Sequence, residues 1–265
     1  MMSKLPLSAW AWLPPLVAAT LFALIALSGA NHNLFLLLNH EGGPLGENFW
    51  VNLTLLGDGA VALALVLPCI KRSPQCLWSA LIAAVVAALL VQGLKQVVNV
   101  PRPLGVFRPG DFYHWGPAYR AVSFPSGHAA AIFAITGIWI MGLSRHYLLR
   151  AALLAVALLV SLSRVMVGVH WPLDLLGGML AGWAAAWTGL ALYARWGWKT
   201  SGIGGFAAGV VLLVIAGALL VSRHIGIPAV LPLQRTLGAV CLVWGAWEMV
   251  RMLPRAQLRR QPKGE

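Results

Sequence analysis

The amino-acid sequence predicts an all-α membrane protein, a polytopic bundle of transmembrane helices. Of its 265 residues, 60% are hydrophobic and only 10% are charged, and the mean hydropathy is +0.80. Soluble domains carry about 25% charged residues, which cover the surface that faces water. The composition therefore excludes a soluble globular domain and an intrinsically disordered chain. The 13 Trp and 28 Gly residues fit a membrane bundle, where Trp anchors the interfaces and Gly permits close helix packing.

Apolar runs long enough to cross a bilayer recur along the whole chain. About 20 apolar residues span the hydrocarbon core. We interpret the first run as a retained span rather than a cleaved signal peptide, because many more follow it. Asp58 interrupts the second run, and Glu248 lies in the eighth. The predicted spans are residues 9–29, 49–70, 76–94, 126–143, 147–167, 173–194, 203–221 and 234–252.

The connections between the spans lead to separate predictions. Residues 34–38 are apolar but too few to cross, which predicts a short helix at the membrane interface. The longest connection, residues 100–125, is rich in Pro, Gly, Arg and aromatic side chains, and such loops in compact bundles are usually functional. Its charged residues fit headgroup recognition and a solvated loop equally well. The G-x-x-x-G pairs at 178–182 and 205–209 predict close helix contacts.

Basic residues predict the orientation, because cytoplasmic loops carry an excess of Lys and Arg. With the N-terminus in the cytoplasm, eight alternating spans leave 12 of the 19 Lys and Arg residues on the cytoplasmic side. The short loop 71–75 is a clear marker of that side. The net charge of +12 favours an anionic lipid or anionic substrate over nucleic acid in so apolar a chain.

The same alternation brings three polar segments to the outer face. They are KQVVNVPRP at 95–103, PSGH at 125–128 and SRVMVGVHWPLD at 163–174. An ionisable residue at the centre of a membrane helix costs roughly 2.5–3.5 kcal/mol on insertion scales. Several such residues at one depth therefore predict a functional site.

The residue types in these segments fit a phosphate group. Lys95, Arg102 and Arg164 supply three cations, and the planar fork of Arg matches phosphate oxygens. Ser126 and Gly127 open a predicted helix, where free backbone N–H groups bind anions and a glycine lets the ligand approach the backbone. These five residues are the predicted phosphate-binding set.

Two histidines and an aspartate add catalytic chemistry. His128 and His170 exchange protons near neutral pH. Asp174, four residues after His170, can accept a hydrogen bond from one imidazole nitrogen and leave the other free to attack. We therefore predict that His170 attacks phosphorus, and that His128 protonates the leaving oxygen and then activates water. No carboxylate cluster suited to magnesium or zinc accompanies them, so we expect no metal and no cofactor.

Other polar residues receive structural interpretations. For Asp58 we expect a structural hydrogen bond or a place at the membrane edge. Glu248 and Arg251 lie three residues apart and are predicted to pair on one helix. Ser123 is interpreted as a cap for the fourth helix.

The three segments together resemble the three-part signature of the type 2 phosphatidic acid phosphatase superfamily. The matching patterns are K-x6-R-P at 95–103, P-S-G-H at 125–128 and S-R-x5-H-x3-D at 163–174. The resemblance covers residues 90–180. It implies a six-helix membrane core and metal-independent hydrolysis of a lipid phosphate, with the roles given above for the eight site residues. Two spans exceed that core, so we divide the chain into a phosphatase core, residues 1–200, and residues 201–265, two further helices and a basic cytoplasmic tail.

The sequence thus predicts a lipid phosphatase or pyrophosphatase of the bacterial inner membrane with its site facing the periplasm. The candidate substrates implied by the resemblance are undecaprenyl pyrophosphate, phosphatidylglycerophosphate, phosphatidic acid and lipid A phosphate. A phosphotransferase that uses the same phosphohistidine is the nearest alternative. A lipid or phosphate transporter, a flippase and a halide-oxidising vanadate enzyme are the others. The expected partners are the bilayer and the lipid substrate, with no nucleic acid, and the oligomeric state is left open.

Overall fold

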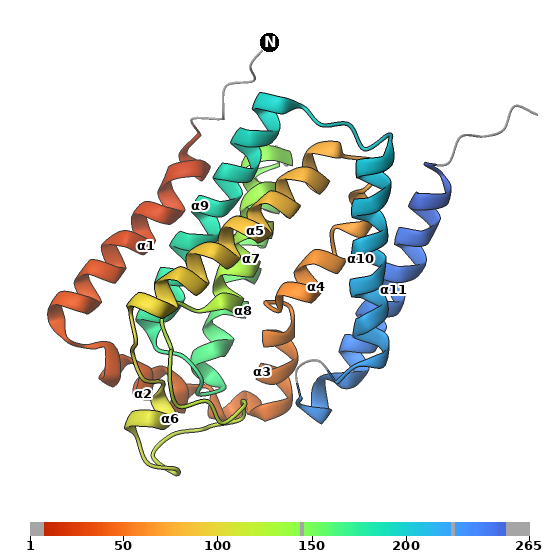
Figure 1. The fold of residues 1–265 in the computed structure, drawn as a ribbon. Coiled ribbons are helices and arrows are strands. Elements are labelled where there is room, and N and C mark those ends of the chain that lie inside the picture. The colour runs from red at the N-terminus through yellow and green to blue at the C-terminus, as the bar shows by residue number, and fades with distance from the viewer. Residues whose placement is uncertain (1–7, 144–145, 224–225, 253–265) are drawn as a thin grey trace, which may run out of the picture.

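A computed structural model of the chain describes residues 8–143, 146–223 and 226–252. Regular structure in these residues is helical throughout, which confirms the predicted class. The bundle (Figure 1) contains, within the described part, six helices long and apolar enough to cross a membrane. They are α1 (Ala9–Ser28), α5 (Pro74–Val97), α8 (Tyr147–Met166), α9 (Pro172–Trp196), α10 (Ile203–Val221) and α11 (Leu231–Val250, with the preceding turn Pro228–Val230). The predicted basic tail lies outside the described residues.

The predicted second span is not one continuous helix. It is divided into α3 (Gly46–Leu55) and α4 (Gly59–Ala64), with a 51° bend between the two segments. Asp58 starts the second segment, because its Oδ1 accepts hydrogen bonds from the N–H groups of Ala60 at 2.9 Å and Val61 at 3.2 Å. The structural hydrogen bond expected for Asp58 is confirmed, and the second span is bent at the residue that interrupts it in the sequence.

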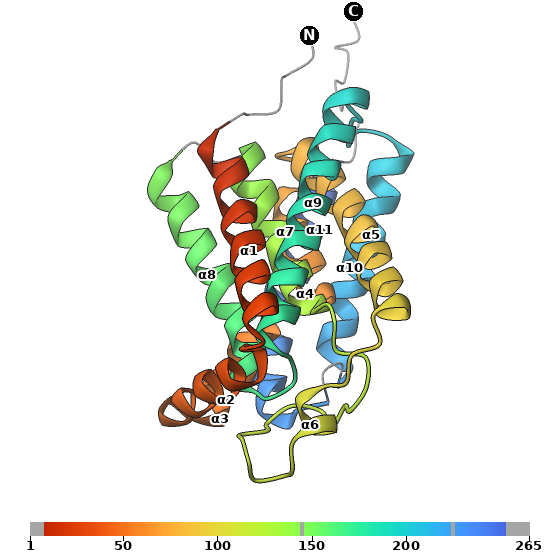
Figure 2. The same ribbon diagram turned by 90° about the vertical axis from the view of Figure 1, so that its left-hand side faces the viewer.

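The predicted fourth span is shorter than a full crossing. It comprises α7 (Gly127–Ile138) and a π-helical continuation, Trp139–Leu143. α7 lies inside the bundle and packs against α5, α8 and α9 (Figure 2). Six helices, or seven with the bent pair, therefore meet the length of a span among the described residues, where the sequence predicts eight.

Two glycines bring α9 against α7. A Cβ atom on Gly178 would lie 2.4 Å from the carbonyl oxygen of Ser126, and one on Gly182 would lie 2.3 Å from that of Ala130. Side chains do not tolerate such distances from backbone oxygen, so only glycine permits this packing. The predicted close contact at 178–182 is confirmed, and it fixes the start of α7 beside the first half of α9.

One end of the bundle, here called the site end, is closed by α2 (Asn31–Glu41) and α6 (Pro103–Val106). α2 runs across the bundle axis at this end (Figures 1 and 2). Its Phe35 is fully buried, with its ring centroid 5.0 Å from that of Trp171 and 5.3 Å from that of Phe112. The Asn39 amide donates to the carbonyl oxygen of Val165 at 3.0 Å. The predicted short helix is therefore present and is packed onto α8 and the turn before α9.

The last two helices pack on α4 and the turn Leu67–Cys69. A Cβ atom on Gly209 of α10 would lie 2.5 Å from Ile70 Cδ1, and one on Gly245 of α11 would lie 2.7 Å from Leu67 Cδ2. The predicted close contact between helices is thus confirmed at Gly209. At Gly205 the close neighbour is instead the carbonyl oxygen of Thr200, in the segment just before α10. α10 and α11 therefore both pack against α4.

Candidate active site

The predicted site residues come from separate segments that meet at the site end. Lys95 lies in the last turn of α5 and Arg164 in the last turn of α8. His128 lies in the first turn of α7 and Asp174 in the first turn of α9. α5 and α8 run toward this end, and α7 and α9 start from it (Figures 1 and 2). The alternation inferred from the sequence therefore brings these side chains to one end of the bundle.

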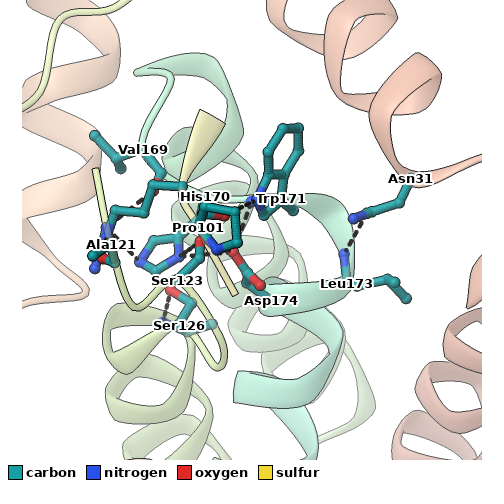
Figure 3. Close-up of polar contacts among 12 residues, drawn as sticks. Asn31, Pro101, Ala121, Ser123, Ser126, Val169, His170, Trp171, Leu173 and Asp174 are labelled. Atoms are coloured by element: carbon teal, nitrogen blue, oxygen red, sulfur yellow. Dashed lines mark hydrogen bonds and ion pairs between the residues drawn. The ribbon is translucent and has the colours of Figure 1, made fainter. Parts of the chain in front are cut away.

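His170 and Asp174 form the centre of the site (Figure 3). Both are nearly inaccessible, at 2% and 1% exposed. His170 Nδ1 lies 3.0 Å from Asp174 Oδ2, and the backbone N–H of Trp171 donates to the same oxygen at 2.8 Å. A carboxylate only accepts, so the imidazole hydrogen is on Nδ1 and Nε2 keeps its lone pair.

Ser123 belongs to this centre, and its interpretation as a helix cap is wrong. The cap of α7 is Ser126, whose Oγ accepts from the N–H of Ala129 at 3.4 Å. Ser123 is fully buried, its hydroxyl donates to Asp174 Oδ2, and its Oγ lies 3.4 Å from His170 Nδ1. A serine four residues before a helix can be mistaken for its cap in the sequence. Only the folding of the loop onto α9 reveals its other partner.

Arg102 is fixed against the free nitrogen of His170. Its Nη1 donates to the carbonyl oxygen of Val169 at 2.9 Å and lies 3.4 Å from His170 Nε2. Its Nε donates to the carbonyl oxygen of Ala121 at 3.1 Å, and the guanidinium lies over the Tyr119 ring, 5.3 Å from the centroid. A buried cation therefore lies where a phosphate attacked by Nε2 would place its oxygens.

The surroundings keep the imidazole of His170 neutral. Burial, and after it the nearby cations of Arg102, Arg164 and Lys95, lower the pKa of His170 well below its ordinary value. The contact with Asp174 is then a hydrogen bond from a neutral ring to a carboxylate. A neutral imidazole whose Nε2 carries no hydrogen is the nucleophilic form.

Arg164 is held by a residue that sequence analysis missed. Its Nη1 donates to the hydroxyl of Thr54 in α3 at 3.0 Å. Its Nε is buried and has no hydrogen-bond partner among the described residues. A buried N–H without a partner is costly and fits a site that an anion completes. Thr54 could not be recognised from sequence, because it lies within an apolar run and its partner is 110 residues away in the chain.

The start of α7 differs in one respect from the prediction. The backbone N–H of Ser126 is not free, because it donates to the carbonyl oxygen of Asp174 at 2.9 Å. The N–H groups of Gly127 and His128, at the first two helical positions, have no backbone acceptor in the part of the chain that is described. The anion-binding donors at this helix start are therefore shifted by one residue from the predicted pair.

His128 links the polar site to an apolar cavity of about 390 Å³ between α4, α5 and α7. Its Nε2 is buried and has no hydrogen-bond partner among the described residues. Asp58, Gly127 and His128 line one end of the cavity, and the rest is lined mostly by alanine and aliphatic side chains as far as Ile138. From 127 to 138 the cavity follows α7 for about 16 Å, roughly half of the hydrocarbon core.

The charge of the site is positive. Lys95, Arg102 and Arg164 all influence His128 and His170 electrostatically, and Asp174 is the carboxylate within hydrogen-bond reach of His170. Among the described residues, no three His, Cys, Asp or Glu side chains gather as a possible metal site. The groups of the described site that could bind an anion are thus the three cations and the N–H groups of α7.

Comparison with known proteins identifies the family. A sequence model of the PAP2 superfamily matches residues 76–200. The chain is also 32% identical to an undecaprenyl-diphosphatase of Sulfolobus acidocaldarius, over 58% of this chain and 74% of the relative. The protein belongs to the PAP2 superfamily. The matched residues contain all three segments of the signature, whereas α10 and α11 follow the matched region.

Other members of the PAP2 superfamily agree in sequence and fold. A lipid A 1-phosphatase of Rhizobium etli is 28% identical over 57% of this chain and 68% of its own. The crystal structure of Aquifex aeolicus LpxE superposes with a TM-score of 0.54 at 29% identity, covering 60% of this chain and 94% of the other. A transmembrane PAP2 type phosphatidylglycerolphosphate phosphatase from Bacillus subtilis, at 22% identity, shares the fold, with a TM-score of 0.54 over 71% and 98%. The protein is accordingly a multi-pass integral membrane protein.

Proposed function

We propose that this PAP2 protein hydrolyses a phosphate ester or pyrophosphate of a membrane lipid through a phosphohistidine at His170. The observation that carries the proposal is the environment of that imidazole. Its Nδ1–H is held by Asp174, and its Nε2 lies 3.4 Å from the Arg102 guanidinium. A neutral nucleophile, fixed in tautomer and placed beside a cation, fits attack on a phosphorus atom.

The first step transfers the phosphoryl group to the protein. His170 Nε2 forms the bond to phosphorus while the bond from phosphorus to the leaving oxygen breaks. His128 gives its proton to that oxygen, which leaves as an alcohol or as a lipid phosphate. Lys95, Arg102 and Arg164, with the N–H groups at the start of α7, stabilise the charge on the three remaining oxygens.

The second step returns the protein to its starting state. His128, now neutral, removes a proton from water, and the water oxygen bonds to phosphorus. The bond between phosphorus and His170 Nε2 breaks, and inorganic phosphate leaves. Asp174 stabilises the positive imidazole during both steps without itself taking the proton. These roles need no metal ion, so we expect activity in the presence of a chelator.

The apolar cavity supports a lipid rather than a soluble phosphate. It reaches His128 and extends for about 16 Å along α7, and apolar surface of this kind stabilises a hydrocarbon chain. Relatives are named for undecaprenyl diphosphate, lipid A and phosphatidylglycerophosphate. We propose those three lipids and phosphatidic acid as the candidate substrates. In this proposal residues 1–200 perform the chemistry, and within residues 201–265 the helices α10 and α11 brace the core from outside.

The charge distribution supports a site that faces the periplasm from the inner membrane. Lys71, Arg72, Lys199 and Arg251 lie at the end of the bundle opposite to the site end, next to the starts of α5 and α10 and the end of α11. In the sequence count, 12 of the 19 Lys and Arg residues fall on this side, and an excess of basic residues marks the cytoplasmic side. The site end then faces the other compartment, near the lipid headgroups.

Phosphate release tests the proposal. Purified protein is incubated with each candidate lipid, labelled in its terminal phosphate, with chelator present and with or without an acceptor lipid. We expect free labelled phosphate from wild type and none from His170→Ala. Label found only on the acceptor would show a phosphotransferase. Lipid transport that continues in His170→Ala, without phosphate release in either protein, would show a transporter.

A further inference from the structure

A second hollow lies at the opposite end of the bundle, far from His170. It is open, has a volume of about 630 Å³, and is lined by Arg72, Ala239, Val240, Val243, Trp244 and Trp247. All of these residues except Arg72 belong to α11. None of them lies within the stretch 76–200 that matches the PAP2 superfamily. The catalytic proposal therefore gives this hollow no role.

The hollow ends at an arginine whose position is fixed. Glu248 is fully buried, and its Oε1 lies 3.0 Å from Arg72 Nε and 3.4 Å from Arg251 Nη1. The Arg72 guanidinium also lies over the Trp244 ring, 5.8 Å from the centroid. An arginine at a membrane surface normally extends freely toward water. Here a buried carboxylate and an indole hold it at the head of an apolar hollow, although its side chain is 60% exposed.

The same place has an excess of positive charge. Lys71 Nζ donates to the carbonyl oxygen of Arg251, so its ammonium lies with the two guanidinium groups. The acidic side chain beside these three cations is Glu248. Its Oε2 has no hydrogen-bond partner among the described residues. Within the described part of the chain, two of these three positive charges are therefore left without a counter-charge. Below them, Val243 and Trp247 are more than 60% exposed and face away from the bundle.

We propose that this hollow binds one anionic glycerophospholipid of the surrounding leaflet. Its phosphodiester bridges Arg72 and Arg251, and an acyl chain lies along Val240, Val243 and Trp247. The excess of positive charge fits an anionic headgroup. The apolar side chains next to it fit a hydrocarbon chain attached to that headgroup. Basic pockets between transmembrane helices on the cytoplasmic side bind acidic headgroups by this combination. Gly245 of α11 packs on Leu67, in the turn that follows α4. A lipid bound to α11 would therefore stabilise the packing around α4.

Native mass spectrometry of the full chain tests this proposal with phosphatidylglycerol and phosphatidylcholine of equal chain length. We expect wild type to retain one phosphatidylglycerol and no phosphatidylcholine. Arg72→Ala combined with Arg251→Ala should lower retention at least about 25-fold, since each basic residue near a membrane surface contributes about 1 kcal/mol, a factor of about five. The control is Arg195→Ala, which removes a charge from the end of α9 and should retain the lipid.

A second variant separates loss of the lipid from loss of the fold. Val243→Trp fills the exposed hollow and leaves the Arg72–Glu248–Arg251 contacts intact. We expect it to lose phosphatidylglycerol while its Tm without added lipid stays that of wild type. Unchanged retention in Val243→Trp would overturn the proposal. So would an equal loss in Arg195→Ala, which would indicate diffuse surface charge. Cysteine cross-linking between two copies at Trp247→Cys, with no lipid retained by wild type, would assign the hollow to a protein partner and overturn it as well.

Discussion

Ser123 donates its hydroxyl hydrogen to the Asp174 carboxylate, at the same oxygen that accepts from the His170 ring. Ser123 therefore acts through Asp174 as a positioning residue. Removing it leaves that oxygen with one donor fewer and allows the carboxylate to rotate. The hydroxyl thus helps to keep the Nδ1–H tautomer of His170, on which attack by Nε2 depends.

Ser123→Ala should lower kcat about 10- to 100-fold, because a hydrogen bond to a charged group contributes about 1.5–3 kcal/mol. Ser123→Thr keeps the donor and should restore most of the rate. The matched control is Thr188→Ala, which removes a hydroxyl bonded only to its own helix at the carbonyl oxygen of Ala184. A Ser123→Ala protein with unchanged kcat and a lowered Tm would mean that the hydroxyl only stabilises the fold.

The pH dependence of kcat/KM should report the lowered pKa of His170. The neutral imidazole attacks, so the acid limb of the profile lies where the pH drops through that lowered pKa. We expect the acid limb of wild type below pH 6.5. The groups facing the ring are Ser123, Asp174, His128, Arg102, Arg164 and Lys95.

Arg102→Gln removes a cation that lowers the pKa of His170, so the acid limb should move to higher pH. Titration of the substrate phosphate is the same for both proteins and cancels in the comparison. An acid limb that stays in place, or moves to lower pH, would contradict the assignment of this limb to His170. The maximum value of kcat/KM should fall as well, because Arg102 also binds phosphate in the proposal.

Gly127 and Gly178 should respond differently to alanine. A Cβ on Gly127 would meet only Val91 Cγ1, at 3.9 Å, so the fold accepts it. It would occupy the room of a phosphate at the helix start, and overpacking costs about 1–3 kcal/mol. We expect Gly127→Ala to raise KM about tenfold at unchanged Tm. Gly178→Ala, whose Cβ would lie 2.4 Å from the carbonyl oxygen of Ser126, should lower Tm. If Gly127→Ala lowered Tm and left KM unchanged, the role of this glycine would be to permit packing and not to admit phosphate.

Filling the apolar cavity should separate lipid from soluble substrates. Ala131 lines the cavity one turn below Gly127. Ala131→Phe should lower kcat/KM for a long-chain lipid phosphate at least about tenfold, the scale of one overpacked side chain. Hydrolysis of a short aryl phosphate should be unaffected. Ala184→Phe, on an exposed face of α9, is the control. Equal losses for both substrates in Ala131→Phe would place the hydrocarbon chain elsewhere.

The sequence predicts the parts of this protein that depend on composition and local spacing. Long apolar runs predicted the helical bundle, and alternation predicted that Lys95, Arg164, His128 and Asp174 share one end. The spacing of four residues placed Asp174 within reach of His170, because His170 lies just before the helix whose first turn contains Asp174. These inferences need only the rise of a helix and the thickness of a bilayer.

Contacts between distant segments could not be predicted in this way. Thr54 reaches Arg164 from 110 residues away in the chain, and hydropathy does not reveal the partner of a polar residue within an apolar run. Glu248 was expected to pair with Arg251 and does so, yet Arg72 approaches it more closely, from 176 residues away in the chain. The N–H of Ser126 was expected to be free but is occupied by Asp174, since glycines bring α9 so close to α7.

Trapping of the phosphorylated protein tests the central claim most directly. An aryl phosphate labelled with ³²P has a leaving group that needs little help from an acid, so His128→Ala should form the phosphohistidine but hydrolyse it slowly. Rapid quenching should then give an acid-labile, alkali-stable label at His170, stronger in His128→Ala than in wild type and absent in His170→Ala. Phosphate release by His170→Ala at the wild-type rate, or label on another residue, would contradict the account.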